Sequence, residues 1–273
     1  MAFERPPTAY THDREEDLPA LGEGGETLSY RQSVSWVSHL WLRHCSLASN
    51  EQSPLNPLAT LEELDKVGAT LQPHLLDPSR GTTTQQVIEY YALELHMNFV
   101  RSGICRRRRS DANISTFEGE SREILLSTLK KALKGSARAY VHLLSMDSRA
   151  IRSWAFIHNG LAAVLLLSLM RDTRYDPEVR SLQENLIQNL VPSNFAADSF
   201  AGPEAAPELT EAHKRAVRAL ESLKRLTEEE TNQQRGQTTE DHDDAAYGSH
   251  GQISVSIPKE LVQQDLDSSQ QTE

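Results

Sequence analysis

The longest apolar run of the chain, WAFIHNGLAAVLLLSLM at residues 154–170, is the feature that most restricts the fold. An Asn-Gly pair between two apolar runs is a common signal for the turn of a β-hairpin. Here, however, the flanking residues do not alternate between apolar and polar, and residues 161–170 are rich in Leu and Ala, which favour a helix. We therefore interpret residues 149–171 as one helix, apolar nearly all round and central to a bundle.

Two residues inside this helix need an explanation. Gly160 costs about 1 kcal/mol in a helix interior relative to Ala, so we expect a neighbouring helix to pack closely against it. His158 would need a nearby nucleophile or carboxylate to act as a catalytic base, and its sequence neighbours include neither. We interpret His158 as a core histidine that requires only a hydrogen-bond partner.

Helical periodicity continues on both sides of this segment. Apolar residues at spacings of three and four predict helices over residues 28–47, 82–100 and 121–146. Thr60 is expected to cap a shorter helix that runs to Leu71. No stretch carries a convincing strand pattern.

Two further helices are expected towards the C-terminus. Asp176-Pro177-Glu178 combines a capping side chain, a proline at the first helical position and an acidic residue, and Pro192 ends the helix that follows. A last helix of about 20 residues carries an apolar stripe from Leu209 to Leu226. The sequence thus predicts an all-α fold, a bundle of about seven helices.

The acidic residues are concentrated at one end. The net charge is −11, and residues 227–273 contain 11 acidic and 2 basic side chains, so the rest of the chain is close to neutral. We expect a poorly ordered arm at 1–27, a helical domain at 28–226 and a disordered acidic tail at 227–273. Because the net charge is negative, the electrostatic field of the whole chain does not favour binding to the phosphates of nucleic acid.

The tail contains one patch of apolar and acidic residues, 253–267, of a kind that folds weakly onto grooves of partner proteins. Its candidate partner-binding anchors are Ile253, Val255, Ile257, Leu261, Val262 and Leu266. An inert tail is the alternative, with equal weight.

Cysteine, metal and catalytic patterns are sparse. Cys45 and Cys105 are the only cysteines, which implies no disulfide framework and suggests a reducing compartment. The acidic run at 240–244 lacks a rigid frame for a metal ion. No phosphate-binding glycine loop, zinc spacing or serine elbow is present. We therefore expect neither an enzyme, nor a cofactor in this chain, nor a membrane protein, since residues 154–170 are marginal in length and interrupted by polar residues.

The only dense basic run is Arg106, Arg107, Arg108 and Arg109. It is a candidate nuclear localisation signal or phosphate-binding patch. A solvated loop beside a helix end is an equally weighted alternative.

Three stretches together resemble the fungal-specific transcription factor domain, or middle homology region, of fungal binuclear zinc-cluster regulators. They are residues 13–32, 71–106 and 152–187. The last is the most specific, because a tryptophan, a Phe-Ile-His-Asn run and a Leu-rich helix are followed by Asp-Pro-Glu-Val-Arg. The resemblance covers roughly residues 13–190 and corresponds to the later part of that domain.

The resemblance implies a nuclear transcription-regulatory protein that controls metabolic or secondary-metabolite genes. The helical region of that family is regulatory rather than catalytic, and its C-terminal end is often an activation segment. The family's zinc cluster uses six closely spaced cysteines, which two cysteines cannot replace. Zinc and DNA contact are therefore expected only through an absent domain or a partner, and the chain is either part of a longer regulator or a stand-alone derivative. Transcription coactivators and a second copy of the chain are the expected partners.

A second hypothesis is a small-molecule-binding helical protein without DNA-binding or catalytic activity. Helical bundles often hold ligands between their helices. The candidate effector pocket lies around Trp154, Phe156 and His158. The two hypotheses are compatible if the small molecule regulates the activity of the transcription-regulatory protein.

Overall fold

The computed structural model describes residues 18, 27–48, 56–107, 119–146, 150, 153–190 and 209–240. The regular elements in these ranges are all helices, and the predicted all-α fold is confirmed. The elements are α1 (Tyr30–Ala48), α2 (Pro57–Ala69), α3 (Pro73–Leu76), the 3-10 helix η2 (Pro78–Arg80), α4 (Thr84–Arg107), α5 (Gly119–Met146), α6 (Trp154–Leu169), α7 (Pro177–Leu190) and α8 (Glu211–Glu240). Within the described ranges, β-type pairing is limited to one isolated bridge between Leu28 and Leu71.

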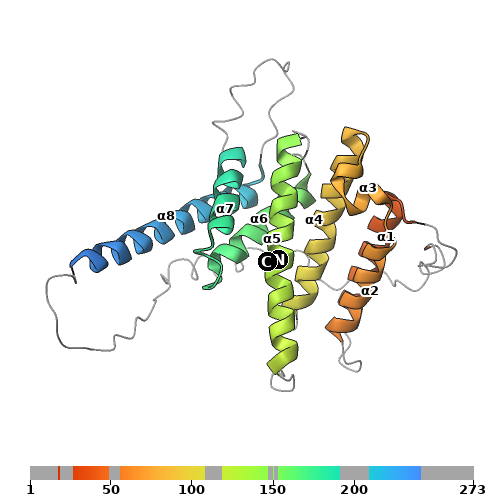
Figure 1. The fold of residues 1–273 in the computed structure, drawn as a ribbon, viewed down its shortest axis with the longest axis horizontal. Helices are drawn as coiled ribbons and strands as arrows, with labels where there is room; N and C mark the ends of the chain where they lie inside the picture. Colours follow the sequence, from red (N-terminus) through yellow and green to blue (C-terminus); the bar gives the residue numbers. More distant parts are fainter. Residues whose placement is uncertain are drawn as a thin grey trace, which may run out of the picture. The chain divides into compact units, whose positions relative to one another are not determined.

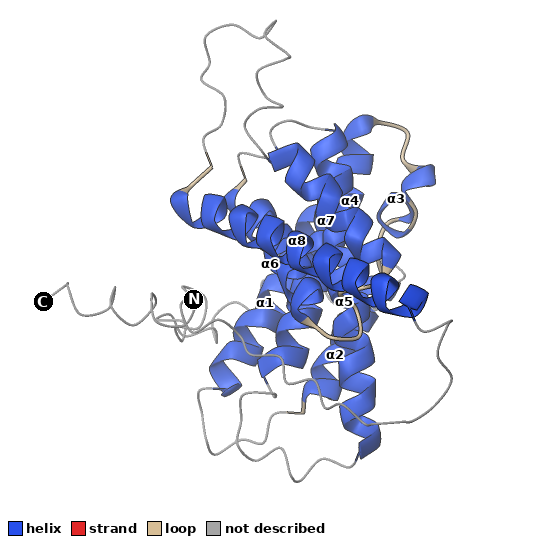
Figure 2. Cartoon of the chain, turned by 90° about the vertical axis from the view of Figure 1, so that its left-hand side faces the viewer, coloured by secondary structure: helices blue, strands red, loops and turns tan. Residues whose placement is uncertain are grey.

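The chain divides into two compact units, residues 1–229 and 230–273. In the first unit α4 and α5 form the central pair, with α1, α2 and α3 against α4, and α6 and α7 against α5 (Figure 1). Viewed from the side of α8, the part of that helix in the first unit lies over α6 and α7 (Figure 2). In the second unit the described residues, 230–240, form the last turns of α8.

Helix α6 runs straight through the Asn-Gly pair, so the expected helix is confirmed and the hairpin alternative is wrong. Asn159 and Gly160 are both buried in it. A Cβ atom on Gly160 would lie 2.0 Å from Cδ1 of Tyr140, a fully buried residue of α5, which confirms the expected close packing. α6 is less central than predicted, because α4 and α5 occupy the middle and both ends of α6 are exposed, Trp154 at 44% and Leu169 at 62%.

The caps explain where α6 and α7 begin. The hydroxyl of Ser153 accepts a hydrogen bond from the backbone N–H of Phe156 at 3.4 Å, so α6 starts at Trp154 rather than at residue 149. The carboxylate of Asp176 accepts from the N–H of Glu178 at 2.9 Å, which confirms the predicted start of α7. Both side chains satisfy N–H groups that the first turn of a helix leaves without partners.

Helix α2 begins earlier than predicted. Its cap is Asn56, whose side chain accepts hydrogen bonds from the N–H groups of Leu58 and Ala59. Pro57 occupies the first helical position, where its fixed φ suits the helix and its missing N–H costs nothing. Thr60, the expected cap, is a buried residue inside the helix.

Helix α8 continues to Glu240 instead of ending near residue 226, so residues 227–240 of the expected tail are helical. Thr227 is buried and its hydroxyl donates to the carbonyl of Leu223 at 2.8 Å. Glu228 pairs with Arg180 of α7 at 3.7 Å. The polar sequence that suggested disorder is rich in Glu and Gln, which are also good helix formers.

In the part of the chain that the structure describes, no helix is both long and apolar enough to span a lipid bilayer.

Candidate functional site

Trp154 and His158 lie on the same face of α6, one turn apart. Their rings stack, with centroids 4.9 Å apart and an angle of 10° between the planes. His158 is only half-buried, which corrects the prediction of a core histidine. The position one turn after an exposed tryptophan places it at the edge of the core rather than within it.

His213 of α8 completes this group. Its side chain is 4% exposed, and its ring centroid lies 6.2 Å from that of Trp154. We call Trp154, His158 and His213 the aromatic cluster. His213 was missed in the sequence because it lies beside the stripe drawn through the leucines and alanines of α8, whereas the stripe that is buried consists of Leu209, His213, Val217, Leu220 and Thr227.

Both histidines of the aromatic cluster are easier to keep neutral than a histidine in water. Burial lowers the pKa of His213. Burial also lowers the pKa of His158, and the neighbouring charges of His213 and Arg106 lower it further. Loss of hydration disfavours a charged imidazole, and nearby cations add to that effect.

The three residues predicted for an effector pocket lie on two sides of α6. Trp154 and His158 face α8, whereas the ring of Phe156 lies 5.5 Å from that of His96 on α4. Burial lowers the pKa of His96 as well. The structure therefore does not bring Trp154, Phe156 and His158 around one space.

A surface depression of about 150 Å³ lies instead between α4 and α5. Its lining consists of Tyr90, Tyr91, Glu94, Gly135, Arg138, Ala139 and His142. The rings of Tyr91 and His142 stack at 4.6 Å across the two helices. No residue of the predicted site belongs to this lining.

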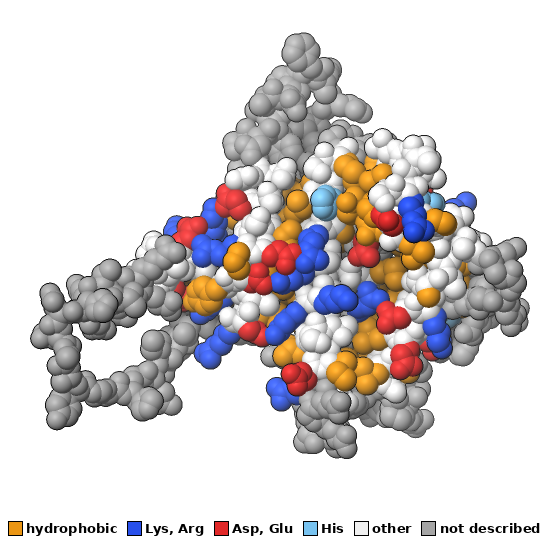
Figure 3. Space-filling model, in the orientation of Figure 1, with side chains coloured by type: hydrophobic (Ala, Val, Ile, Leu, Met, Phe, Trp, Pro, Cys, Tyr) orange, Lys and Arg blue, Asp and Glu red, His pale blue; other side chains and the backbone are white. Residues whose placement is uncertain are grey.

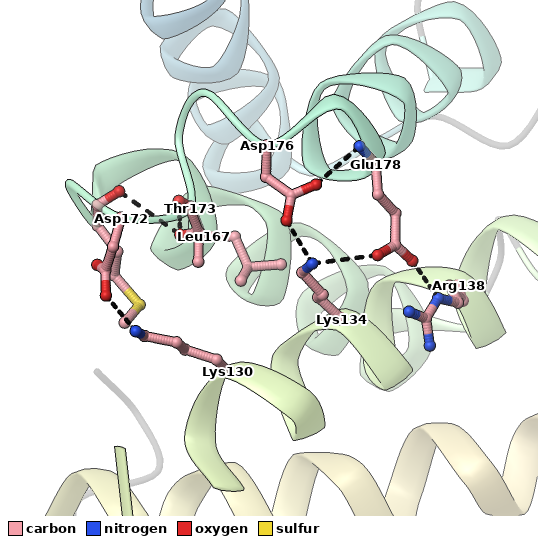
Figure 4. Close-up of polar contacts among 9 residues, drawn as sticks. Lys130, Lys134, Arg138, Leu167, Asp172, Thr173, Asp176 and Glu178 are labelled. Carbon is pink, nitrogen blue, oxygen red and sulfur yellow. Dashed lines mark hydrogen bonds and ion pairs between the residues drawn. The ribbon is translucent and has the colours of Figure 1, made fainter. Parts of the chain in front are cut away.

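Three basic residues on one face of α5 contact the connection between α6 and α7 (Figure 4). Lys130 pairs with Asp172, Lys134 with Asp176 and Arg138 with Glu178. Lys134 also reaches Glu178 at 3.1 Å. We call these six residues the ion-pair ladder. Figure 3 shows basic and acidic side chains interspersed across the middle of this face.

In the pairs of Lys134 with Asp176 and of Arg138 with Glu178, the pKa values are shifted in the direction that strengthens the pair. A hydrogen bond from Lys134 holds the pKa of Asp176 below its usual range, and one from Arg138 does the same for Glu178. The bond to Asp176 in turn raises the pKa of Lys134. Charges so matched favour a structural role, because each acid already has its base.

The connection itself is held by Thr173. Its hydroxyl donates a hydrogen bond to the carbonyl of Leu167 at 2.6 Å and closes the end of α6 (Figure 4). The carboxylate of Asp176 binds both the start of α7 and Lys134. One aspartate thus couples helix capping to the ladder.

The first half of the basic run belongs to a helix rather than to the solvated loop that was one of the two alternatives. Arg106 and Arg107 are the last residues of α4, and Arg106 is half-buried. Arg108 and Arg109 lie outside the described residues. Beside them Cys105 is buried, and burial raises the pKa of its thiol to about 11, so the thiolate is scarce at neutral pH.

The other predicted sites have no counterpart in the described residues. The six apolar anchors between Ile253 and Leu266 lie outside the described residues. In the described ranges, no three His, Cys, Asp or Glu side chains come together as a metal site would require.

Comparison with known proteins yields no match. No protein-family model matches the chain, and neither a curated protein nor a solved structure is detectably similar to it. The resemblance of residues 13–190 to the fungal-specific transcription factor domain therefore stays a prediction.

Proposed function

We propose that this chain is a nuclear transcription-regulatory protein whose helices form a regulatory module of the fungal zinc-cluster type. In this proposal it reaches DNA only through another domain or a partner, and it recruits coactivators through its acidic tail. The observation that carries the proposal is the resemblance of residues 152–187 to that family.

The roles of the distinctive residues in that stretch support the proposal. Ser153 and Asp176 cap helices, and Gly160 allows two helices to approach. These are roles in building a scaffold, as a regulatory module requires. Opposite charges in the ion-pair ladder are already matched, which is typical of a scaffold rather than of a site that awaits a substrate.

The composition of the tail supports the second half of the proposal. Residues 253–267 combine six apolar anchors with acidic residues, as segments that bind hydrophobic grooves do. Because α8 extends to Glu240, the segment to test as an activator begins at residue 241.

The proposal is tested by fusing residues 241–273 to a foreign DNA-binding domain and measuring a reporter gene. We expect activation that is lost when Ile257, Leu261 and Val262 are changed to serine. The matched control changes Gln263 and Gln264 to serine, which leaves the apolar anchors in place, and should retain activation. A silent fusion that is expressed at normal levels would contradict the proposed recruitment of coactivators.

The depression between α4 and α5 favours the alternative of a small-molecule-binding protein. It offers stacked aromatic rings together with Glu94 and Arg138. Its volume of about 150 Å³, however, is below the roughly 300–1,000 Å³ of ligand pockets for drug-sized molecules. We therefore place ligand binding second.

A further inference from the structure

The part of α8 that belongs to the first unit makes polar contacts at one place and an aromatic contact at another. Towards its middle, polar contacts join it to α7: the side chain of Gln183 donates to the carbonyl of Leu220 at 2.9 Å, and Lys224 pairs with Glu184. Near its start, the contact with α6 is the aromatic cluster, in which His213 lies against Trp154. The start of α8 thus packs through an imidazole as well as through the buried side chain of Val217.

His213 is an unexpected residue for a buried seam. It is 4% exposed, and neither of its ring nitrogens has a hydrogen-bond partner among the described residues. A buried polar group without a partner lowers stability, whereas a leucine at the same place would pack without that cost. Packing alone therefore does not explain why a histidine occupies this position.

Burial disfavours a proton on His213, and burial together with nearby positive charges disfavours a proton on His158. His158 faces His213 from α6, and the two rings lie on the same tryptophan. The positive charge of Arg106 on α4 lowers the pKa of His158, as the charge of His213 also does. On α8 itself Lys214 is paired with Glu211 at 3.0 Å.

From α7, the charged residues that reach α8 do so further along the helix. Glu184 is paired with Lys224, and Arg180 is paired with Glu228. These pairs hold the middle of α8 whatever the charge on His213.

We propose that the aromatic cluster is a proton-sensitive latch: with neutral His158 and His213 it holds the start of α8 on α6, and protonation of the two histidines releases it. This inference goes beyond the proposed function and holds whatever the partners of the protein are. Release would expose two buried apolar residues, Leu209 just before α8 and Val217 in its first two turns.

The direction of the effect follows from proton linkage. In the closed latch the pKa of both histidines is lowered, chiefly by burial, and in the released helix each returns towards the ordinary value of about 6.5. The released form therefore binds more protons below that pH, and acidification favours release. At pH 5.5 the opening equilibrium rises by up to about tenfold for each histidine, and above pH 7 it does not change.

Hydrogen exchange of the full chain, measured at pH 7.5 and 5.5 and corrected for the intrinsic exchange rates, tests the latch. We expect amides in residues 212–219 of α8 to lose protection at pH 5.5, by up to about tenfold for each histidine that takes up a proton, while amides in residues 125–145 of α5 keep theirs. Unchanged protection of α8 at pH 5.5 would overturn the proposal.

Two substitutions assign the effect to the cluster. His158→Phe and His213→Phe keep an aromatic ring against Trp154 but cannot take up a proton, so each should reduce the pH response and the double variant should abolish it. His96→Phe is the matched control, because His96 is a half-buried histidine next to α6 that does not belong to the cluster, and this variant should keep the response of α8.

Circular dichroism at pH 7.5 establishes that each variant is folded, and His213→Gln serves as a second non-ionising variant if His213→Phe is not. A response that persists in the double variant, or that disappears in His96→Phe, would overturn the assignment to His158 and His213.

Discussion

At the scale of single residues, Gly160 has the largest effect on how α5 and α6 pack, because it has no side chain. Gly160 lets α6 approach α5 so closely that a Cβ atom would come within 2.4 Å of Cγ and 2.8 Å of Cβ of Tyr140. These are atoms near the backbone of a fully buried residue, so they cannot swing aside as the end of a flexible chain could. The glycine thus sets the distance between the two helices.

Gly160→Ala should therefore destabilise the protein, although alanine is the better helix former. We expect a net loss of about 1–3 kcal/mol in the free energy of unfolding, measured by urea denaturation, because overpacking a filled core outweighs helix propensity. Gly68→Ala is the matched control: a Cβ there would meet only the terminal methyl of Met97 at 3.4 Å, and stability should stay the same or rise slightly. Equal stability of the two variants would show that α5 and α6 are further apart than described.

At the scale of helices, the ion-pair ladder aligns three elements at once. Lys130, Lys134 and Arg138 of α5 bind acidic residues before and at the start of α7, and Thr173 closes the end of α6. Individual pairs at a surface stabilise little, about 0–1 kcal/mol. Here the same acidic residues also hold the start of a helix, so the geometry of the turn depends on them.

The ladder should make stability depend on pH in the acidic range. The pKa values of Asp176 and Glu178 are lowered in the folded protein, so their contribution is fully present above their ordinary values near 4 and is lost as the pH falls through the lowered values. Asp176→Asn with Glu178→Gln should be less stable than the native protein at pH 7, with a difference that shrinks at pH 3.

Asparagine is also a good cap, so this double variant removes the charges and leaves the helix start intact. Thermal unfolding at both pH values measures the difference, and Glu221→Gln, at an exposed position of α8, is the control that should change neither. A difference that is the same at pH 7 and pH 3 would mean that the charges of the ladder do not contribute.

At the scale of the whole molecule, the net charge and the pairing of basic residues bear on whether the protein binds DNA directly. The net charge is −11, and several basic residues of the helices are engaged with acidic ones, such as Arg43 with Glu63 and Arg101 with Asp65. Counterion release from DNA needs basic groups that are free to face phosphates. This charge balance is consistent with the proposed function, in which another domain or a partner contacts DNA.

The full chain alone should therefore show no sequence-specific DNA binding at physiological salt. Fluorescence anisotropy with a panel of labelled duplexes is the measurement, and we expect at most weak binding that disappears as salt is raised. Binding in the nanomolar range that discriminates between duplexes would contradict the proposed division of labour, in which another domain or a partner contacts DNA.

Much of the helical fold could be predicted because its signals are local. Asp176, Pro177 and Glu178 lie next to one another, and the cap they form needs no distant residue. The apolar stripe of α7 likewise repeats within single turns. The end of α8 was harder, because Glu- and Gln-rich sequence suits both a helix and a disordered tail, and a contact such as Glu228 with Arg180 is not visible in the sequence.

The sequence by itself determined that the chain is helical, where most of its helices lie, and that Gly160 needs a close neighbour, since these follow from periodicity, capping and backbone preference over a few residues. Only the tertiary structure decided that the neighbour is Tyr140, that the basic face of α5 meets the start of α7, and that His213 joins Trp154 and His158. Such partners are far apart in the chain, and they meet because of how helices pack, a property that no local pattern encodes.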